Sequence, residues 1–274
     1  MLVANLNGYS VDALGAARGL EYRCPSCKHI IVLKQGRQVV HHFAHKPPIS
    51  CDWAAGETRA HLSAKLLVRD ALRARGLRAE TEFVVDTLPG DRRADVMTWR
   101  AGDSRMVAFE LQHSALAPEL IEARANSYAR AGIAQIWIPF LNGNTIGRAD
   151  DRESGLFIER YSPRPFEKWI DGFCDKGGMW MYDPRTQLFW RGSFRAHRLY
   201  VQETTYFTEG GDEMTGGNFF RDSKRFRDLD LLGPFQFSQL RITIKHQLGR
   251  RAGTHWWSDG KVAHLVPAAD AATS

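Results

Sequence analysis

Residues 92–97 read RRADVM and residues 106–112 read MVAFELQ, and these two stretches decide how the first half of the chain folds. Both have the apolar and β-branched composition of strands. Asp95 lies inside the first stretch, and Glu110 and Gln112 end the second. Residues two apart on a strand point to the same face, so Glu110 and Gln112 should face the same way. Carboxylates gathered at the ends of neighbouring strands, beside a polar partner, predict an oxygen-ligand site suited to Mg²⁺.

The elements around these stretches predict an α/β fold. A helix of good helix formers is expected over residues 58–75, and Gly76 should end it. Three strands follow, the first at residues 82–85. Pro118 opens a second helix that ends at Gly132, and residues 134–138 form a compact apolar strand. The order helix, strand, strand, strand, helix, strand predicts a mixed sheet with a helix on each side.

Composition and charge bound the class of protein. The chain has 274 residues, of which 43% are hydrophobic and 25% charged, and a formal net charge of +6. This basic excess is compatible with a polyanion partner such as DNA. The start of the chain lacks a secretory signal pattern, and the longest apolar stretch, residues 133–141, is too short to span a bilayer. With only four cysteines, the simplest expectation is a reduced, cytoplasmic protein that does not enter membranes.

Cysteines and histidines near the N-terminus have the spacing of a zinc site. Residues 24–27 read CPSC, residues 41–45 read HHFAH, and Cys51 follows. A tetrahedral Zn²⁺ site needs four such ligands, commonly on two knuckles joined by a hairpin, here predicted from strands at 30–33 and 38–40. The expected ligands are three cysteines and one histidine, with His42 as the alternative histidine: Cys24, Cys27, His45 and Cys51. Four protein ligands favour a closed, structural zinc; the competing interpretation is small buried thiols beside histidines on a surface loop.

Glu57, His61 and Lys65 recur every four residues and form one polar stripe on the first predicted helix. A solvated helix face explains such a stripe equally well. The stripe comes just before the strands that carry Asp95 and Glu110, which favours a functional site.

Seven short motifs in this order resemble the competence protein CoiA-like family within the PD-(D/E)XK nuclease superfamily. The resemblance spans roughly residues 20 to 140. Its motifs are CPSC at 24–27, HFAH at 42–45, GET at 56–58 with His61 and Lys65, RADV at 93–96, ELQHS at 110–114, Arg124 with Tyr128, and IWI at 136–138.

The resemblance implies a metal-dependent nuclease whose active site consists of Glu57, Asp95, Glu110 and Gln112. Asp95 and Glu110 would bind Mg²⁺ or Mn²⁺, and Glu57 would reach the site through a water or a second ion. Gln112 stands where the superfamily more often has lysine, and its neutral amide can only orient the attacking water. The residues expected to hold the DNA backbone or the leaving group are Lys65, His61, Arg93 and Arg124.

The implied partner is DNA, single- or double-stranded, with a role in DNA uptake, recombination or defence against foreign DNA. Two rival hypotheses are a non-cleaving, DNA-binding recombination accessory protein and a zinc-dependent hydrolase acting at the Cys/His cluster. A homodimer or a protein partner in recombination or defence is a further expectation. The expected domains are an N-terminal zinc-finger-like segment at 1–55, a nuclease-like core at 56–145 and a C-terminal α+β extension at 146–274.

The C-terminal half carries one stretch with a functional pattern. Residues 219–227 read FFRDSKRFR and interleave aromatic rings with positive charge, as in stacking platforms for single-stranded DNA. An amphipathic helix covering a small core has the same pattern. Strands are expected over residues 179–190, 194–207 and 239–246.

Overall fold

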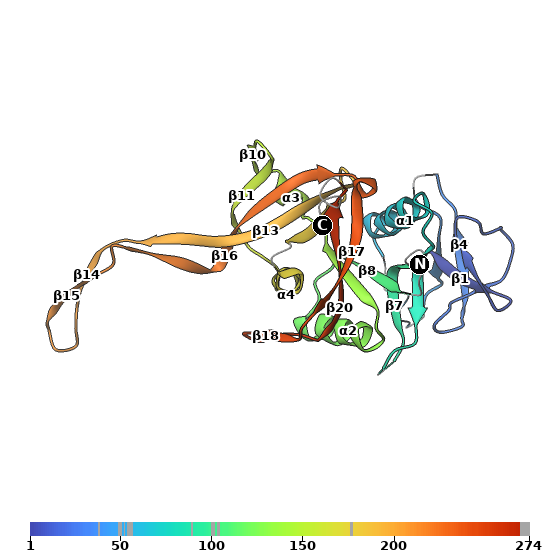
Figure 1. Ribbon diagram of the computed structural model, residues 1–274, viewed down its shortest axis with the longest axis horizontal. Coiled ribbons are helices and arrows are strands. Elements are labelled where there is room, and N and C mark those ends of the chain that lie inside the picture. The colour runs from blue at the N-terminus through green and yellow to red at the C-terminus, as the bar shows by residue number, and fades with distance from the viewer. Residues whose placement is uncertain are drawn as a thin grey trace.

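The computed structural model describes residues 1–268 except 38, 49–50, 52, 54–56, 89, 100–101, 103–104 and 176–177. Gln38 of the predicted hairpin and Gly56 of the GET motif therefore lie outside the described residues. Figure 1 shows an N-terminal lobe at one end, a central body, and a long β-ribbon that leaves the body on the opposite side. None of the described helices combines the length and apolarity needed to cross a membrane.

The N-terminal lobe is a five-stranded antiparallel sheet, in the order β2-β1-β3-β4-β5. The predicted hairpin is present, but its second strand is residues 42–45, and residues 39–40 lie outside it. The cause is burial: the lobe buries Phe43 at 1% exposure against Tyr22, whereas Val39 stays 39% exposed. The strands are β1 (Val3–Leu6), β2 (Tyr9–Asp12), β3 (Tyr22–Arg23), β4 (Ile30–Lys34) and β5 (His42–His45).

The central sheet has six strands in the order β17-β20-β9-β8-β7-β6. β9 pairs in parallel with both β8 and β20, and all its residues are buried, as expected for a strand covered on both faces. Strands β17 and β20 come from the region expected to form a separate C-terminal extension. The strands are β6 (Ala79–Val85), β7 (Arg92–Trp99), β8 (Met106–Gln112), β9 (Ala134–Pro139), β17 (Leu240–Gln247) and β20 (Gly260–Pro267).

Helices cover both faces of this sheet, as predicted. α1 (Arg59–Arg73) packs Ala64, Val68 and Leu72 against one face, and the hydroxyl of its N-cap Thr58 accepts a hydrogen bond from the His61 amide at 3.2 Å. α2 (Pro118–Arg130) begins with proline and covers the other face beside α4 (Pro165–Cys174). The result is a mixed α/β body with few helices.

A third sheet, in the order β10-β11-β16-β13-β12, packs beside the central one, and the Leu141 amide donates to the Tyr182 carbonyl at 2.8 Å between them. Residues 219–227 form part of β16 in this sheet, so the amphipathic-helix interpretation is wrong. The remaining elements are α3 (Gly143–Ile146), β10 (Asp150–Arg152), β11 (Gly155–Tyr161), β12 (Met179–Asp183), β13 (Leu188–Val201), β14 (Thr204–Phe207), β15 (Glu213–Gly216), β16 (Phe219–Phe235), a 3₁₀ turn (Phe237–Gln239), β18 (Arg250–Ala252) and β19 (His255–Trp257).

Candidate functional site

The polar stripe, which begins at Glu57 just before α1, faces Asp95 in the middle of β7. Asp95 Oδ1 lies 3.0 Å from Lys65 Nζ, and Asp95 Oδ2 lies 3.2 Å from His61 Nε2. Glu57, at the start of the stripe, forms an ion pair with Lys65 and lies 3.8 Å from His61 Nδ1. These side chains are therefore a buried polar cluster between α1 and the sheet, and the solvated-face explanation is wrong for this stripe.

The Asp95 side chain bonds the backbone of β8 at the point where β7 and β8 stop pairing with each other. The ladder between β7 and β8 ends at the Val96–Phe109 pair, and beyond it the Leu111 amide donates to Asp95 Oδ2 at 2.8 Å. Asp95 is 8% exposed. Burial alone would raise the pKa of Asp95, but the positive charge of Lys65 and then the His61 ring lower it well below the ordinary value. The carboxylate is therefore ionised at neutral pH.

Lys65 is the electrostatic centre of the cluster, with 0% exposure. Its ammonium contacts three carboxylates, those of Glu57, Glu82 and Asp95, with 3.2 Å to Glu82 Oε1. Burial disfavours the charged lysine, but the three carboxylates outweigh it and raise the pKa of Lys65. Burial likewise opposes ionisation of Glu57, and the charge of Lys65 still lowers the pKa of Glu57 to about 2.

Glu82 is a member of the cluster whose role the sequence patterns did not indicate. It is 3% exposed, and its Oε2 accepts hydrogen bonds from the amides of Leu2 at 2.8 Å and Val3 at 3.2 Å. Its φ of 53° breaks the regular geometry of β6 and turns the side chain out of the usual alternation. In the sequence Glu82 comes two residues after Glu80 in the same strand, so no local pattern distinguishes it.

Glu110 faces α2 and not Lys65. Its Oε1 accepts hydrogen bonds from the Tyr128 hydroxyl at 2.6 Å and from Arg124 Nε at 3.1 Å. Burial raises the pKa of Glu110 to about 7, although Arg124 opposes the shift. Gln112, two residues on, donates its amide to the Ser114 carbonyl at 2.5 Å.

Three of the predicted site residues offer ligand atoms close enough to share one ion. The atoms of Glu57, His61 and Asp95 lie within 4.8 Å of one another, and Glu110 is not part of this group. Two carboxylates and an imidazole are donors that fit a divalent cation. Arg93 borders the group: its Nη2 lies 3.8 Å from Glu57 Oε1, and its guanidinium lies over the Trp53 ring.

The second cluster is in the N-terminal lobe. Ligand atoms of all four predicted residues, Cys24, Cys27, His45 and Cys51, lie within 4.8 Å of one another. Cys27 Sγ lies 3.3 Å from His45 Nε2, and all three cysteines are free of disulfides. The alternative ligand His42 instead directs Nδ1 to the Val40 carbonyl at 2.8 Å. Three sulfurs and one imidazole nitrogen are the donor set of a closed tetrahedral metal site.

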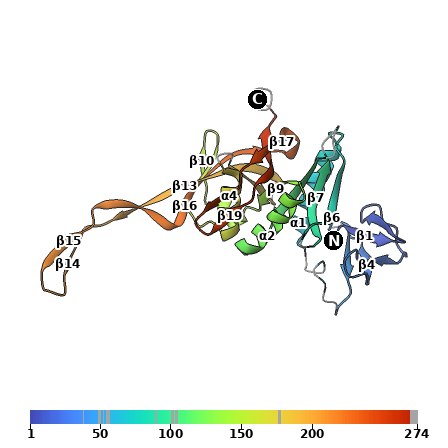
Figure 2. The same ribbon diagram turned by 60° about the horizontal axis from the view of Figure 1, so that its bottom comes forward.

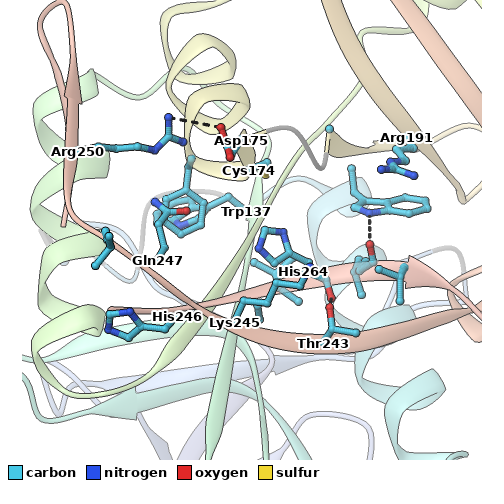
Figure 3. A pocket seen from close by; sticks show the side chains of 18 residues that line it. Trp137, Cys174, Asp175, Arg191, Thr243, Lys245, His246, Gln247, Arg250 and His264 are labelled. Carbon is cyan, nitrogen blue, oxygen red and sulfur yellow. Dashed lines mark hydrogen bonds and ion pairs between the residues drawn. The ribbon is translucent and has the colours of Figure 1, made fainter. Parts of the chain in front are cut away.

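A cleft of about 560 Å³ lies on another part of the body, between α4 and strands β17 and β20. Figure 3 shows Lys245, His264 and Arg250 along it, with Asp175 paired to Arg250 at 3.8 Å. None of the predicted site residues lines this cleft.

Comparisons with known proteins identify two family domains in this chain. Residues 6–54 match the family described as "Competence protein CoiA, N-terminal domain", and residues 57–192 match "Competence protein CoiA, nuclease-like domain". The competence protein CoiA of Bacillus subtilis is 30% identical over 116 residues, which are 42% of this chain and 30% of that protein. A protein of unknown function with a crystal structure has 17% sequence identity to this chain. The match covers 30% of this chain and 47% of that protein, with a TM-score of 0.23.

The two matched regions together account for well over half of the chain, and the matched part spans under a third of the Bacillus relative. They also contain both clusters, the Cys₃His group in the first region and the Glu57–His61–Asp95 group in the second. By these matches the chain belongs to the competence protein CoiA family and contains its N-terminal and nuclease-like domains.

Proposed function

We propose that this chain is a Mg²⁺- or Mn²⁺-dependent nuclease that hydrolyses DNA phosphodiester bonds with a PD-(D/E)XK nuclease-like core. The observation that carries the proposal is the group of Glu57, His61 and Asp95 ligand atoms within 4.8 Å, next to a fully buried lysine. A bound divalent ion would neutralise charge on the phosphate and lower the pKa of water. The membership of a family with a nuclease-like domain supports the same reaction.

The side chains of this chain have distinct proposed roles. Asp95 and Glu57 hold the ion, Glu110 joins them once its carboxylate turns from Arg124 and Tyr128 towards Asp95, and Gln112 orients the attacking water. Lys65 keeps Asp95 and Glu57 ionised, because its charge lowers the pKa of both carboxylates.

The residues proposed to bind phosphate lie around this site. Arg93, 21% exposed, and Arg124, 32% exposed, both reach solvent beside it and bind the phosphates of the backbone. His61 is kept in place by Asp95 and serves as a hydrogen-bonding partner or as an acid for the leaving group.

Purified protein incubated with linear, circular and single-stranded DNA, in Mg²⁺ or in Mn²⁺, tests the proposal. We expect cut products with the wild type and at least about 10²-fold slower cleavage with Glu110→Ala. The matched control is Glu119→Ala, since Glu119 is exposed on the same helix that Glu110 faces and should cut like the wild type. Binding of DNA without any product in either metal would reject the enzyme.

Two observations favour the rival function, a non-cleaving DNA-binding accessory protein in recombination. The ammonium of Lys65 lies among the carboxylates that would hold the ion, and glutamine replaces the usual catalytic lysine. The cleavage assay distinguishes the two functions. In either case we propose that the chain acts in DNA uptake, in recombination or in defence against foreign DNA. We also propose that it forms a homodimer or binds a protein partner in recombination or defence.

We propose that Cys24, Cys27, His45 and Cys51 hold one structural Zn²⁺. Metal analysis should find one zinc per chain, and Cys27→Ser should lose most of it and lower the thermal midpoint, because metal binding contributes to the folding free energy of small lobes. Cys174→Ser is the matched control, since Cys174 lies in α4, and its variant should keep the zinc. Full zinc content in Cys27→Ser would contradict this ligand set. Loss of zinc without loss of cleavage would also exclude a zinc-dependent hydrolase at the cluster.

A further inference from the structure

The β-ribbon that leaves the body has two parts of opposite charge. The neck consists of residues 195–201 of β13 paired with residues 219–226 of β16, and the tip consists of residues 202–218. Figures 1 and 2 both show the ribbon extending far beyond the body, on the side opposite the N-terminal lobe. Neither part can bury a core, because a two-stranded ribbon exposes both its faces.

The neck concentrates positive charge. It holds one carboxylate, Asp222, against five exposed cationic side chains: Arg195, Arg198, Arg221, Lys224 and Arg225. Arg195 pairs with Asp230 at the base of the ribbon, at 2.5 Å. The other four have no carboxylate partner within the part of the chain that the structure describes. A net excess of this size on so thin an element attracts a polyanion.

Aromatic rings lie among these charges. Tyr200 and Phe220 are opposite one another in the ladder, with ring centroids 5.2 Å apart, and are 52% and 57% exposed. The guanidinium of Arg198 lies 4.9 Å from the Phe220 ring on the same face. Phe219 is 51% exposed. Large rings that stay about half exposed are available for contact with a partner.

The tip differs from the neck in charge although it also exposes aromatic rings. Its 17 residues contain four carboxylates and no lysine or arginine: Glu203, Glu209, Asp212 and Glu213. The strand ladder is interrupted between the Val201–Phe219 and Thr204–Gly216 pairs. Gly217 lies in this interruption with φ +118°, and a Cβ there would meet the Gln202 carbonyl oxygen at 2.2 Å. The acidic tip repels phosphates, so a polyanion would contact the neck and not the tip.

We propose that the neck is a second nucleic-acid contact, in which unpaired bases stack on the exposed rings of Tyr200 and Phe220 on one face, or of Phe219 on the other, while the surrounding cations bind phosphates. Stacking on aromatic rings within a basic track is how single strands are bound without sequence choice. A two-stranded ribbon also fits the major groove of a duplex, but half-exposed rings on the ribbon favour the single strand. This contact goes beyond the proposed hydrolysis, because it requires binding and not cleavage.

Binding of a fluorescent oligothymidylate, measured by anisotropy without added Mg²⁺ or Mn²⁺, tests the neck whether or not the chain cleaves DNA. The double variant Tyr200→Thr, Phe220→Thr should weaken binding at least about tenfold. The matched control changes the same residue types on the tip, Tyr206→Thr with Phe207→Thr, at 53% and 70% exposure, and should bind within about twofold of the wild type. All four positions are exposed, and unchanged thermal midpoints verify folding.

The charges are tested separately. The triple variant Arg198→Gln, Arg221→Gln, Lys224→Gln should reduce the slope of log affinity against log salt by about 2, because each phosphate of a single strand that the protein no longer neutralises lowers the slope by roughly 0.7. Wild-type affinity in both neck variants overturns the proposal. If the neck variants bind only duplex DNA more weakly, the assignment to single strands is overturned. If they lose dimers while DNA binding is unchanged, the neck is a surface for self-association and not for DNA.

Discussion

Replacing Asp95 with asparagine should slow DNA cleavage by about 10³-fold or more while the protein stays folded. Asparagine keeps the shape of the side chain and can still accept the Leu111 amide, but it removes the negative charge that lies 3.2 Å from His61 Nε2 and 3.0 Å from Lys65 Nζ. Lys65 keeps two carboxylates, Glu57 and Glu82, so the buried ammonium is not left unpaired. Single-turnover cleavage of linear DNA in Mg²⁺ and in Mn²⁺ measures the effect.

The matched control is Asp91→Asn, which makes the same chemical change four residues earlier at an exposed position. It should cleave at the wild-type rate. Equal rates for wild type and Asp95→Asn, with the thermal midpoint unchanged, would remove Asp95 from the reaction. A lowered thermal midpoint that accounts for the lost activity would assign Asp95 to stability and not to catalysis.

Lys65→Met should have the largest effect on stability. The substitution leaves Glu57, Glu82 and Asp95 buried without their shared cation, and removing one partner of a buried ion pair costs about 3–5 kcal/mol. For a chain of this size that corresponds to a thermal midpoint lower by roughly 10 °C. Calorimetry or circular dichroism measures it, with Lys168→Met on the exposed face of α4 as the control.

The pH dependence separates an electrostatic cause from simple loss of packing. In the wild type the pKa of Glu57 is lowered from 4.5 to about 2, so this carboxylate stabilises the fold above its unfolded pKa, and the contribution is lost as pH falls from 4.5 towards 2. Without Lys65, only the N-terminal ammonium and Arg93 still lower the pKa of Glu57 against its burial, so the variant should lose less stability than the wild type as pH falls from 4.5 towards 2. Adding Glu82→Gln to Lys65→Met should recover part of the loss. An equal deficit at about pH 4 and about pH 8 would contradict the electrostatic account.

Local patterns predicted the two helices and five of the six strands of the central sheet, and no strand was expected at β20. Residues 58–75 and 118–131 were expected as helices and are α1 and α2 to within two residues, because Thr58, Pro118 and the glycines at positions 76 and 132 mark their ends. The pairing of β20 with β9 joins segments far apart in the chain and leaves no local signal. The second strand of the zinc-lobe hairpin was misplaced because Val39 and Phe43 are both apolar, and only packing against Tyr22 selects Phe43.

The candidate site was predictable as a set of side chains but not as a geometry. The four-residue spacing of Glu57, His61 and Lys65 predicted one helix face, and that face contacts Asp95. The strand alternation that predicted Glu110 beside the ion could not show that Tyr128 and Arg124 would bond its carboxylate from α2. The role of Glu82 could not be predicted from the sequence, because it depends on a positive φ and on hydrogen bonds from the amides of residues 2 and 3.

The position of β20 has a consequence for the nascent chain. β9 ends at Pro139 and its parallel neighbour begins at Gly260, so a ribosome adding about 5–20 residues per second takes roughly 6–25 seconds to supply the partner. During that interval one edge of the apolar strand β9 has unpaired backbone hydrogen-bonding groups. Such an edge can pair with other unfinished polypeptides. Cellular chaperones that cover such edges would therefore set the yield of this protein during its synthesis.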